Sequence, residues 1–210
     1  SFVRWMNSDF GFNSADVFIN TAVLSFDLSV FDIFVAIKCG ASITLIPGHL
    51  AMFPAQFASF IENEGITVLN SVASVIASLA AKGRLERFKF ESLRRVLFSG
   101  DVMPTKHLKV ATQSMNNAQF FNVYGQTEAN SSTCYLVDKI PQDINWVVPI
   151  GKSLPGFEVF ALNESGKTIV SPHEIGELYV KGHSVAMGYL GDKSATSKAF
   201  VTDPRGDVTD

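Results

Sequence analysis

The run 122–128, NVYGQTE, holds side chains of the types that bind nucleotides. An aromatic ring, a glycine, a hydroxyl and a carboxylate fall within five residues, at Tyr124, Gly125, Thr127 and Glu128. The ring can stack on a purine, and the glycine lets a ligand approach the backbone closely. The hydroxyl can donate to a phosphate oxygen, and the carboxylate can bind Mg²⁺ through its hard oxygens. The alternative is a strand-to-loop turn with an incidental glutamate, because short motifs also match by chance.

Asp27 is a second candidate, because it stands between the apolar run 22–24 and an apolar helical segment. We expect its carboxylate to be largely buried, which is costly unless a cation or hydrogen bonds compensate. The ammonium group of a substrate would be such a cation. The alternative is that Asp27 caps the helix that begins near Ser29 or Val30.

Two further segments are weaker signals when taken alone. The run 97–101, LFSGD, ends a strand with a glycine and an acid and can offer backbone groups to a ligand, or it is an ordinary turn. The run 176–190 alternates apolar residues between glycines, as in the core of a β-hairpin. The four histidines have no metal-ligand spacing.

The elements that must position these residues alternate between helix and strand. Hydrophobic periodicity predicts helices at 30–38, 54–64, 71–81 and 105–114, and strands at 42–47, 66–69, 93–98 and 119–123. This alternation predicts an α/β fold with a mostly parallel sheet flanked by helices, which binds ligands at the carboxyl ends of its strands.

The pattern changes near residue 149, where glycines separate short strand signals at 158–162 and 177–181. We therefore expect two parts. Residues 1–148 would form an α/β subdomain with the substrate pocket and the site at which Tyr124 can stack on a purine. Residues 149–210 would form a small β-rich, barrel-like subdomain that is incomplete.

Composition excludes several classes of function. The 210 residues are 47% hydrophobic and 18% charged, with a net charge of −3 and no basic cluster, so we expect no nucleic-acid partner. No apolar run approaches the roughly 20 residues of a membrane helix, so we expect no membrane partner. Cys39 and Cys134 predict buried free thiols in a reducing compartment, hence a cytoplasmic protein. The chain begins at Ser1 and ends in a polar stretch, so we expect a segment of a longer protein.

Taken in order, these motifs resemble the adenylate-forming superfamily. The likeness is strongest to amino-acid adenylation domains of nonribosomal peptide synthetases and to stand-alone D-alanine–carrier-protein ligases. It runs along almost the whole chain and rests on four segments: 25–30 (SFDLSV), 122–128, 176–182 (GELYVKG) and 188–190 (GYL). The resemblance implies a fragment of the large N-terminal domain of an adenylate-forming enzyme.

The resemblance also implies a reaction and its cofactors. An amino acid would react with ATP and Mg²⁺ to give an aminoacyl-adenylate, and the acyl group would pass to the phosphopantetheine thiol of a carrier protein. Thr127 would touch the α-phosphate and Glu128 would bind Mg²⁺, which makes these two the catalytic residues. The nucleotide site would comprise Gly100, Asp101, Asn122, Tyr124, Gly125 and Thr127.

The same resemblance implies an amino-acid site, in which Asp27 pairs with the α-ammonium group. The selectivity pocket would comprise Leu28, Phe31, Asn70, Leu97, Ser99, Val123, Ser131 and Ser132. This mixture implies a small or medium-sized side chain that can be polar, rather than a large aromatic or charged one. The stretches 26–34 and 96–104 look particularly like the D-alanine ligases.

The sequence departs from the family pattern in several places. Gln126 stands where the family usually has proline. The family's phosphate loop would precede Ser1, and its ribose-binding aspartate and mobile C-terminal domain with the catalytic lysine have no counterpart here. We therefore expect these 210 residues alone to be inactive. The alternatives to an amino-acid ligase are an acyl- or aryl-acid CoA ligase and a non-catalytic homologue used for binding or regulation.

Overall fold

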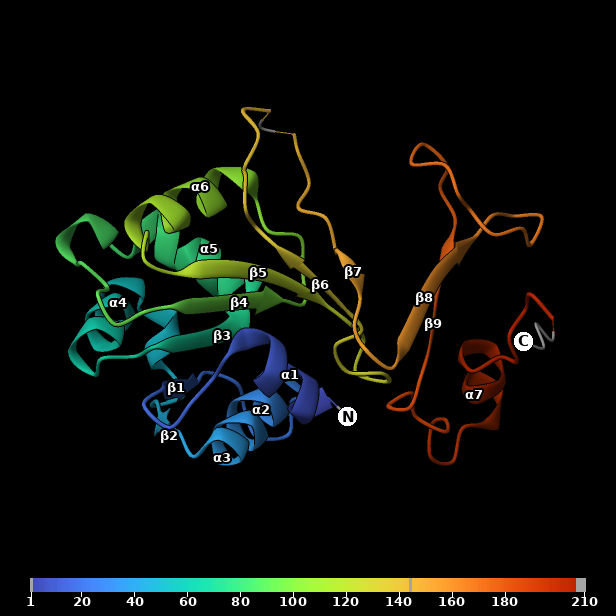
Figure 1. Ribbon diagram of the computed structural model, residues 1–210, viewed down its shortest axis with the longest axis horizontal. Helices are drawn as coiled ribbons and strands as arrows, with labels where there is room; N and C mark the ends of the chain where they lie inside the picture. The colour runs from blue at the N-terminus through green and yellow to red at the C-terminus, as the bar shows by residue number, and fades with distance from the viewer. Residues whose placement is uncertain (1, 144, 207–210) are drawn as a thin grey trace.

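The computed structural model of the protein describes residues 2–143 and 145–206, which are built around a large, mostly parallel sheet (Figure 1). Its seven strands lie in the order β2-β1-β3-β4-β5-β6-β7. The first five are parallel to their neighbours, and β6 and β7 are added antiparallel. The strands are β1 (Val17–Asn20), β2 (Ser42–Leu45), β3 (Val68–Val72), β4 (Arg95–Ser99), β5 (Gln119–Tyr124), β6 (Thr133–Leu136) and β7 (Lys152–Ser153).

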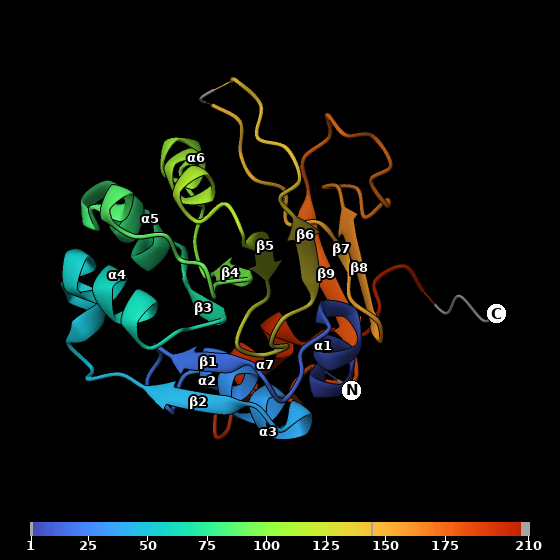
Figure 2. The same ribbon diagram turned by 60° about the vertical axis from the view of Figure 1, so that its left-hand side comes forward.

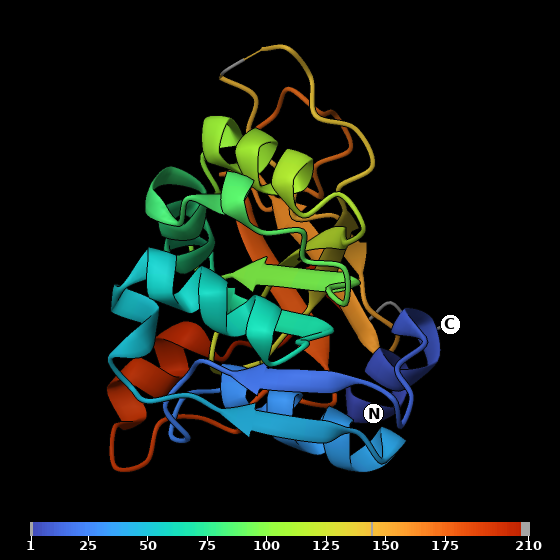
Figure 3. The same ribbon diagram turned by 90° about the vertical axis from the view of Figure 1, so that its left-hand side faces the viewer.

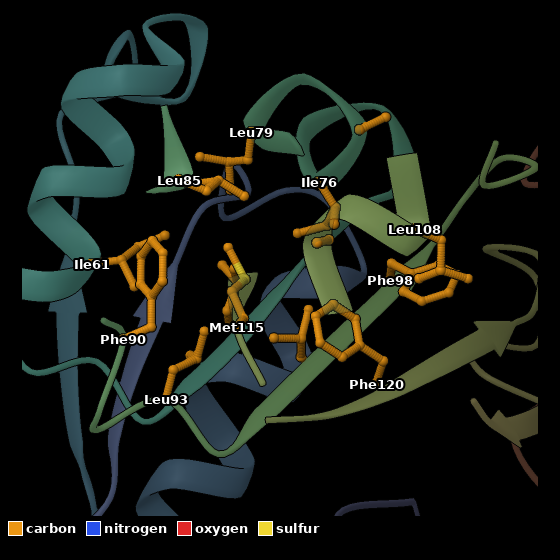
Figure 4. Packing of buried hydrophobic residues seen from close by; sticks show 14 of the residues in the cluster. Ile61, Ile76, Leu79, Leu85, Phe90, Leu93, Phe98, Leu108, Met115 and Phe120 are labelled. Carbon is orange, nitrogen blue, oxygen red and sulfur yellow. The ribbon is translucent and has the colours of Figure 1, made fainter. Parts of the chain in front are cut away.

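Three helices of similar length pack against one face of this sheet (Figure 2). They are α4 (Pro54–Asn63), α5 (Ala73–Lys82) and α6 (Thr105–Ser114), and the short helices η2 (Leu50–Met52) and η3 (Leu85–Arg87) lie in the connections. Their apolar sides meet the strands in the larger hydrophobic core, where Ile61, Ile76, Phe98, Leu108 and Phe120 are all buried (Figure 4). This core makes the sheet a rigid platform for whatever binds at the ends of its strands.

The opposite face is covered by helix α1 (Phe2–Phe10) and by a continuous helical segment of residues 28–39. Aromatic rings dominate this second core, with Phe12, Phe18 and Phe31 packed within 6 Å of one another, centroid to centroid. Strands β1 and β2 run side by side in the same direction at this end of the molecule (Figure 3).

The helix predicted at 30–38 is real, but it is not a uniform α-helix. It comprises α2 (Leu28–Val30), a π-helical turn η1 (Phe31–Val35) and α3 (Ala36–Cys39), and it ends at Gly40, whose left-handed φ of 71° suits a glycine. A π-helical turn adds a residue to one turn and is frequent at functional sites. Here the turn buries Phe31, Asp32 and Val35.

The small β-rich part is an antiparallel hairpin of β8 (Phe157–Leu162) and β9 (Glu177–Gly182), followed by helix α7 (Lys193–Ala199). The hairpin stands beside the large sheet, at the right of Figure 1. Strand β7 pairs with β6, so the large sheet includes residues beyond position 148.

The remaining predicted elements are present, with their ends shifted by no more than three residues. The sequence did not predict α1, β1, β6, β7 or α7. Both cysteines are free, but each is only half-buried, which is less than we expected. Within the described ranges, no helix has the length and apolar character needed to cross a membrane.

Candidate functional site

A cavity of about 240 Å³ lies at the carboxyl ends of β3, β4 and β5. The helical segment 28–39 and the loop 125–131 close its sides, and Met6 of α1 contributes to its wall. This is the edge at which an open parallel sheet binds its ligands.

The cavity brings together nearly all residues of the predicted amino-acid site. Its walls include Asp27, Leu28, Phe31, Asn70, Leu97, Ser99, Val123 and Ser131. Strand register explains part of this arrangement, because Asn70 of β3 lies opposite Leu97 of β4 and both side chains face the same side of the sheet. Val123 lies two positions after Phe121, the register partner of Leu97, and therefore faces the same way.

Ser132 is the member of that set that the structure does not bring to the cavity. It is fully buried, and its Oγ has no hydrogen-bond partner among the described residues. Its backbone N–H donates to the carbonyl of Tyr124. Because side chains alternate along an extended chain, Ser131 lines the cavity while Ser132 points away from it.

Asp27 lies on the wall of the cavity, but it is only half-buried, in contrast to our expectation of a largely buried carboxylate. It occupies the position before α2, yet its side chain makes no capping hydrogen bond. Within the described part of the chain, its carboxylate oxygens accept no hydrogen bond at all. The interpretation of Asp27 as a helix cap therefore loses its physical basis, and the carboxylate is available to a ligand.

Part of the predicted nucleotide site lines the same cavity, namely Gly100, Gly125 and Thr127. Gly100 has a φ of 81°, in the left-handed region that favours glycine. A side chain at Gly125 would place its Cβ 1.8 Å from the carbonyl oxygen of Asn130, so only glycine fits the crossing of these two loop segments. The hydroxyl-bearing Thr127 is exposed at the rim.

The other predicted nucleotide residues lie around the cavity rather than in its wall. Asn122 is buried, and its Nδ2 donates to the carbonyl of Pro149 at 2.9 Å, which ties β5 to the segment before β7. Tyr124 is half-buried at the end of β5. Asp101 is exposed, and one carboxylate oxygen accepts the backbone N–H of Val102 at 2.7 Å. Their contacts with a nucleotide remain predictions.

Glu128 lies outside the cavity and contacts the segment that follows β9. The phenol of Tyr189 donates a hydrogen bond to Oε1 of Glu128, and the backbone N–H of Ala186 donates to the Glu128 carbonyl at 2.7 Å. The hydrogen bond from Tyr189 holds the pKa of Glu128 below its usual value, so the side chain is a carboxylate at neutral pH. An anionic oxygen donor of this kind suits Mg²⁺, which typically binds one or two carboxylates together with substrate phosphates.

A second, broader cleft of about 800 Å³ lies between this loop region, β9 and α7. Glu128 and Tyr189 both line it, together with Lys181 and Asp203. Glu128 therefore stands between Thr127, at the rim of the first cavity, and this cleft.

Sequence reasoning missed several residues of the site. Phe26, Gln126 and Asn130 line the cavity, as does Met6. Asn130 has a φ of 58°, a conformation that asparagine adopts more readily than most residues, and its Oδ1 accepts the N–H of Ser131 at 2.6 Å. In the sequence, the asparagine between Ala129 and two serines could have indicated a turn at Asn130, because asparagine and serine favour turns.

A buried carboxyl group behind the cavity wall was also missed. Asp32, in the π-helical turn, is 1% exposed. Asn20 donates to its Oδ2 at 3.0 Å and Asn70 donates to its Oδ1 at 3.1 Å. Burial raises the pKa of Asp32 to about 7, although both hydrogen bonds act in the opposite direction. In the sequence, a single acid within the otherwise apolar run 30–37, VFDIFVAI, could have indicated a buried carboxyl group.

Comparison with known proteins finds relatives that align with nearly the whole chain. The AMP-binding enzyme family matches residues 1–190. An L-proline–[L-prolyl-carrier protein] ligase of Streptomyces coelicolor is 35% identical over 99% of this chain and 40% of its own length. A D-alanine–D-alanyl carrier protein ligase of Bacillus licheniformis is 29% identical over 95% of this chain and 40% of its own length. The Vibrio cholerae adenylation domain AlmE, solved with glycyl-adenosine-5'-phosphate, superposes with a TM-score of 0.81 at 28% identity, over 96% of this chain and 38% of its own.

The fold is that of an adenylate-forming enzyme. The chain belongs to the AMP-binding enzyme family. It spans about 40% of the length of the carrier-protein ligases that it matches.

Proposed function

We propose that the whole protein activates an amino acid with ATP and transfers it to the phosphopantetheine thiol of a carrier protein. The observation that carries this proposal is the carboxylate of Asp27 on the wall of the cavity, without a capping hydrogen bond. A carboxylate in that position suits a substrate with an ammonium group, whereas a fatty or aryl acid gains nothing from it.

The nucleotide would bind beside the amino acid, over the loop that follows β5. Gly100 and Gly125 leave the backbone accessible at the cavity, and Thr127 supplies a hydroxyl at the same wall. Glu128 supplies an anionic oxygen nearby, and Mg²⁺ bound there would neutralise charge on the phosphates. The resemblance assigns Tyr124 to the adenine ring, and its half-buried position at the end of β5 is compatible with stacking.

The proposed reaction has two steps. A carboxylate oxygen of the amino acid attacks the α-phosphorus of ATP, and pyrophosphate leaves with the electrons of the broken P–O bond. The thiol sulfur of the carrier then attacks the acyl carbon, AMP leaves, and a thioester forms. The residues described here contribute mainly by holding the two reactants in line, because positioning and charge stabilisation dominate displacements at phosphorus.

The cavity supports a substrate with a small or medium-sized side chain. Its volume is about 240 Å³, and Phe31 and Leu97 narrow it from two sides. The names of the relatives point the same way, since they specify proline and D-alanine, and glycyl-adenylate is the ligand of AlmE.

The test is amino-acid-dependent ATP–pyrophosphate exchange by the full-length protein. The panel should hold the proteinogenic amino acids, D-alanine and a few aryl and fatty acids. Exchange with one small or polar amino acid is the expected result. Exchange only with acids that lack an ammonium group would remove the role assigned to Asp27 and favour a CoA ligase, and a protein that binds ATP without any exchange would favour a non-catalytic homologue.

A further inference from the structure

The buried group Asp32 links three elements behind the cavity. Asn20 ends β1, Asn70 lies in β3, and Asp32 belongs to the π-helical turn that packs on both strands. Asn20 and Asn70 are register partners on adjacent parallel strands, so their side chains face the same side of the sheet and converge on one carboxyl group. The three side chains are 7%, 6% and 1% exposed for Asn20, Asn70 and Asp32 respectively.

The hydrogen bonds determine how the carboxamide of Asn70 is oriented. Its Nδ2 donates to Oδ1 of Asp32 at 3.1 Å and to the backbone carbonyl of Leu28 at 3.4 Å. The backbone carbonyl of Leu28 can only accept, so it requires the NH₂ end of Asn70 whatever the protonation state of Asp32. When Asp32 is ionised, its carboxylate can also only accept and requires the same NH₂ end.

The remaining atom, Oδ1 of Asn70, consequently faces the cavity that this residue lines. Within the described part of the chain it accepts no hydrogen bond, and it is not among the sealed polar atoms that lack a partner. A buried side chain thus presents one free acceptor to whatever fills the cavity.

We propose that Asp32 is a positioning residue of the amino-acid site, which, with Asn20, holds the Asn70 carboxamide so that its oxygen accepts a hydrogen bond from the substrate. This inference rests on the proposed function. The ligand chemistry is an N–H or O–H donor of the amino acid, supplied either by the α-ammonium group or by the side chain.

The conservative variant Asp32→Asn makes the proposal specific. Asn20 has no second partner comparable to Leu28 among the described residues, so it can turn its amide and accept from the new NH₂ group. The oxygen of the substituted side chain then still accepts from Asn70. Asp32→Asn is therefore expected to keep the KM for the amino acid within about 3-fold of the wild type, whereas Asp32→Leu removes the acceptor entirely.

The experiment measures pyrophosphate exchange by full-length variants, with separate KM values for the amino acid and for ATP. Asp32→Leu is expected to raise the KM for the preferred amino acid by roughly 10- to 100-fold, the usual effect of a lost buried hydrogen bond, with the KM for ATP little changed. Asp16→Asn is the control, because Asp16 is a similarly buried carboxyl group, 2% exposed, that pairs with Arg94 away from the cavity. An equal change in both KM values, or the same profile in Asp32→Leu and the control, would overturn the proposal.

A double-mutant cycle separates positioning from a general loss of stability. If Asp32 acts through Asn70, Asp32→Leu has little further effect on KM in an Asn70→Leu background, whereas additive effects would contradict the proposal. Loss of affinity for all amino acids alike would identify the α-ammonium group as the donor, and loss confined to side chains with a hydroxyl or amine would identify the side chain. If Asp32→Leu fails to fold, Asp32→Ser keeps a polar group at the site and serves in its place.

A readout without substrate distinguishes this inference from the proposed function. A wild type that exchanges with no amino acid would refute the function but not the positioning role. Crystal structures of the full-length wild type and Asp32→Leu, both without ligand, test the positioning directly. A reoriented Asn70 side chain in the variant is expected, and an unchanged Asn70 that still donates to the Leu28 carbonyl would overturn the proposal.

Discussion

Tyr189 donates a hydrogen bond from its phenol to the carboxylate of Glu128, although 61 positions of sequence separate the two residues. Two further hydrogen bonds join the same segments, from Ala186 N–H to the Glu128 carbonyl and from Ser184 Oγ to the Ala129 carbonyl, at 2.7 and 2.8 Å. The segment after β9 therefore fixes the position of the residue to which we assign Mg²⁺.

Tyr189→Phe is expected to weaken Mg²⁺ binding by Glu128. Without the hydroxyl, the carboxylate of Glu128 loses the donor that orients it, and outer-sphere partners of metal ligands typically contribute about 10- to 100-fold in affinity. Because the pair is exposed, we expect about a 10-fold higher Mg²⁺ concentration at half-maximal pyrophosphate exchange in the full-length protein.

The control for that experiment is Tyr179→Phe. Its phenol also donates to a nearby surface carboxylate, that of Glu177 at 3.0 Å, but within the described part of the chain it donates no hydrogen bond to Glu128. The same Mg²⁺ midpoint in both variants would show that the Tyr189 hydrogen bond is incidental.

Asp27→Ala is expected to impair use of the amino acid and to leave ATP binding nearly intact. A fully buried, unpaired ammonium group would cost about 3–5 kcal/mol, but Asp27 is half-buried, so water can compensate in part. We therefore expect a loss closer to that of a charged hydrogen bond, about 1.5–3 kcal/mol, or a KM for the amino acid raised about 10- to 150-fold. The measurements are ATP binding and amino-acid-dependent exchange, made separately, with Asp138→Ala as control because Asp138 is exposed. If the affinities for ATP and for the amino acid fall equally, the role of Asp27 is structural.

The periodic elements of this chain could be predicted because local pattern determines them. Helix α6 has the predicted bounds, and α4 differs from prediction by one residue, since each has a clear apolar stripe and a defined start. Strand β1 and helix α1 were missed because neither has a clear period: β1 has three apolar residues in a row, and the nine residues of α1 mix polar and apolar side chains. Tertiary packing of their aromatic residues stabilises them instead.

Only part of the candidate site could be predicted from the sequence, for a related reason. Gly125 and Thr127 belong to one contiguous motif, and both line the cavity. Asp32 was not predicted from the sequence, because its environment depends on Asn20 and Asn70, which lie 12 and 38 positions away. The sequence prediction placed a buried carboxylate at Asp27, whereas the π-helical turn buries the carboxyl group five positions later.

Gly125→Ala is expected to disrupt the loop 125–131 and with it both parts of the site. The added methyl group would lie 1.8 Å from the Asn130 carbonyl oxygen, well inside contact distance, so the loop must open. We expect exchange activity to fall by at least 10-fold and the unfolding free energy to fall by about 1–3 kcal/mol, as for other overpacked sites. Gly48→Ala is the control, because its Cβ would meet no atom within 4 Å; equal effects of the two substitutions would contradict this account.

The two buried aspartates are expected to have opposite effects on stability as pH changes. For Asp32, burial raises the pKa from 3.8 to about 7, so the folded state binds the proton more tightly and stability falls as pH rises from about 4 to 7. For Asp16, burial acts to raise the pKa, but hydrogen bonds from Arg94, Asn13 and Thr67 outweigh it and lower the pKa. Its contribution is therefore present above pH 3.8 and is lost as pH falls through the folded-state pKa.

Urea unfolding of the full-length protein at several pH values measures both effects. In the wild type, Asp32 is expected to lower the unfolding free energy by up to about 4 kcal/mol as pH rises from 4 to 8, and Asp32→Asn is expected to remove this decrease. Asp16→Asn is expected to reduce the decrease in unfolding free energy below pH 4. Each variant is compared with the wild type at each pH, so that the contributions of other titrating groups cancel. An unchanged slope between pH 4 and 8 in Asp32→Asn would contradict the raised pKa.

Ser131 and Ser132 are adjacent, yet the structure predicts different outcomes for the same substitution. Ser131 lines the cavity, so Ser131→Ala is expected to change the KM for the amino acid by about 3- to 10-fold, the effect of one neutral hydrogen bond. The buried Oγ of Ser132 has no partner among the described residues, so Ser132→Ala removes an uncompensated polar group. We expect Ser132→Ala to leave the KM unchanged and to raise the unfolding free energy by about 1 kcal/mol. A shift in amino-acid preference in Ser132→Ala, with none in Ser131→Ala, would mean that the loop 125–131 adopts a different register when substrate is bound.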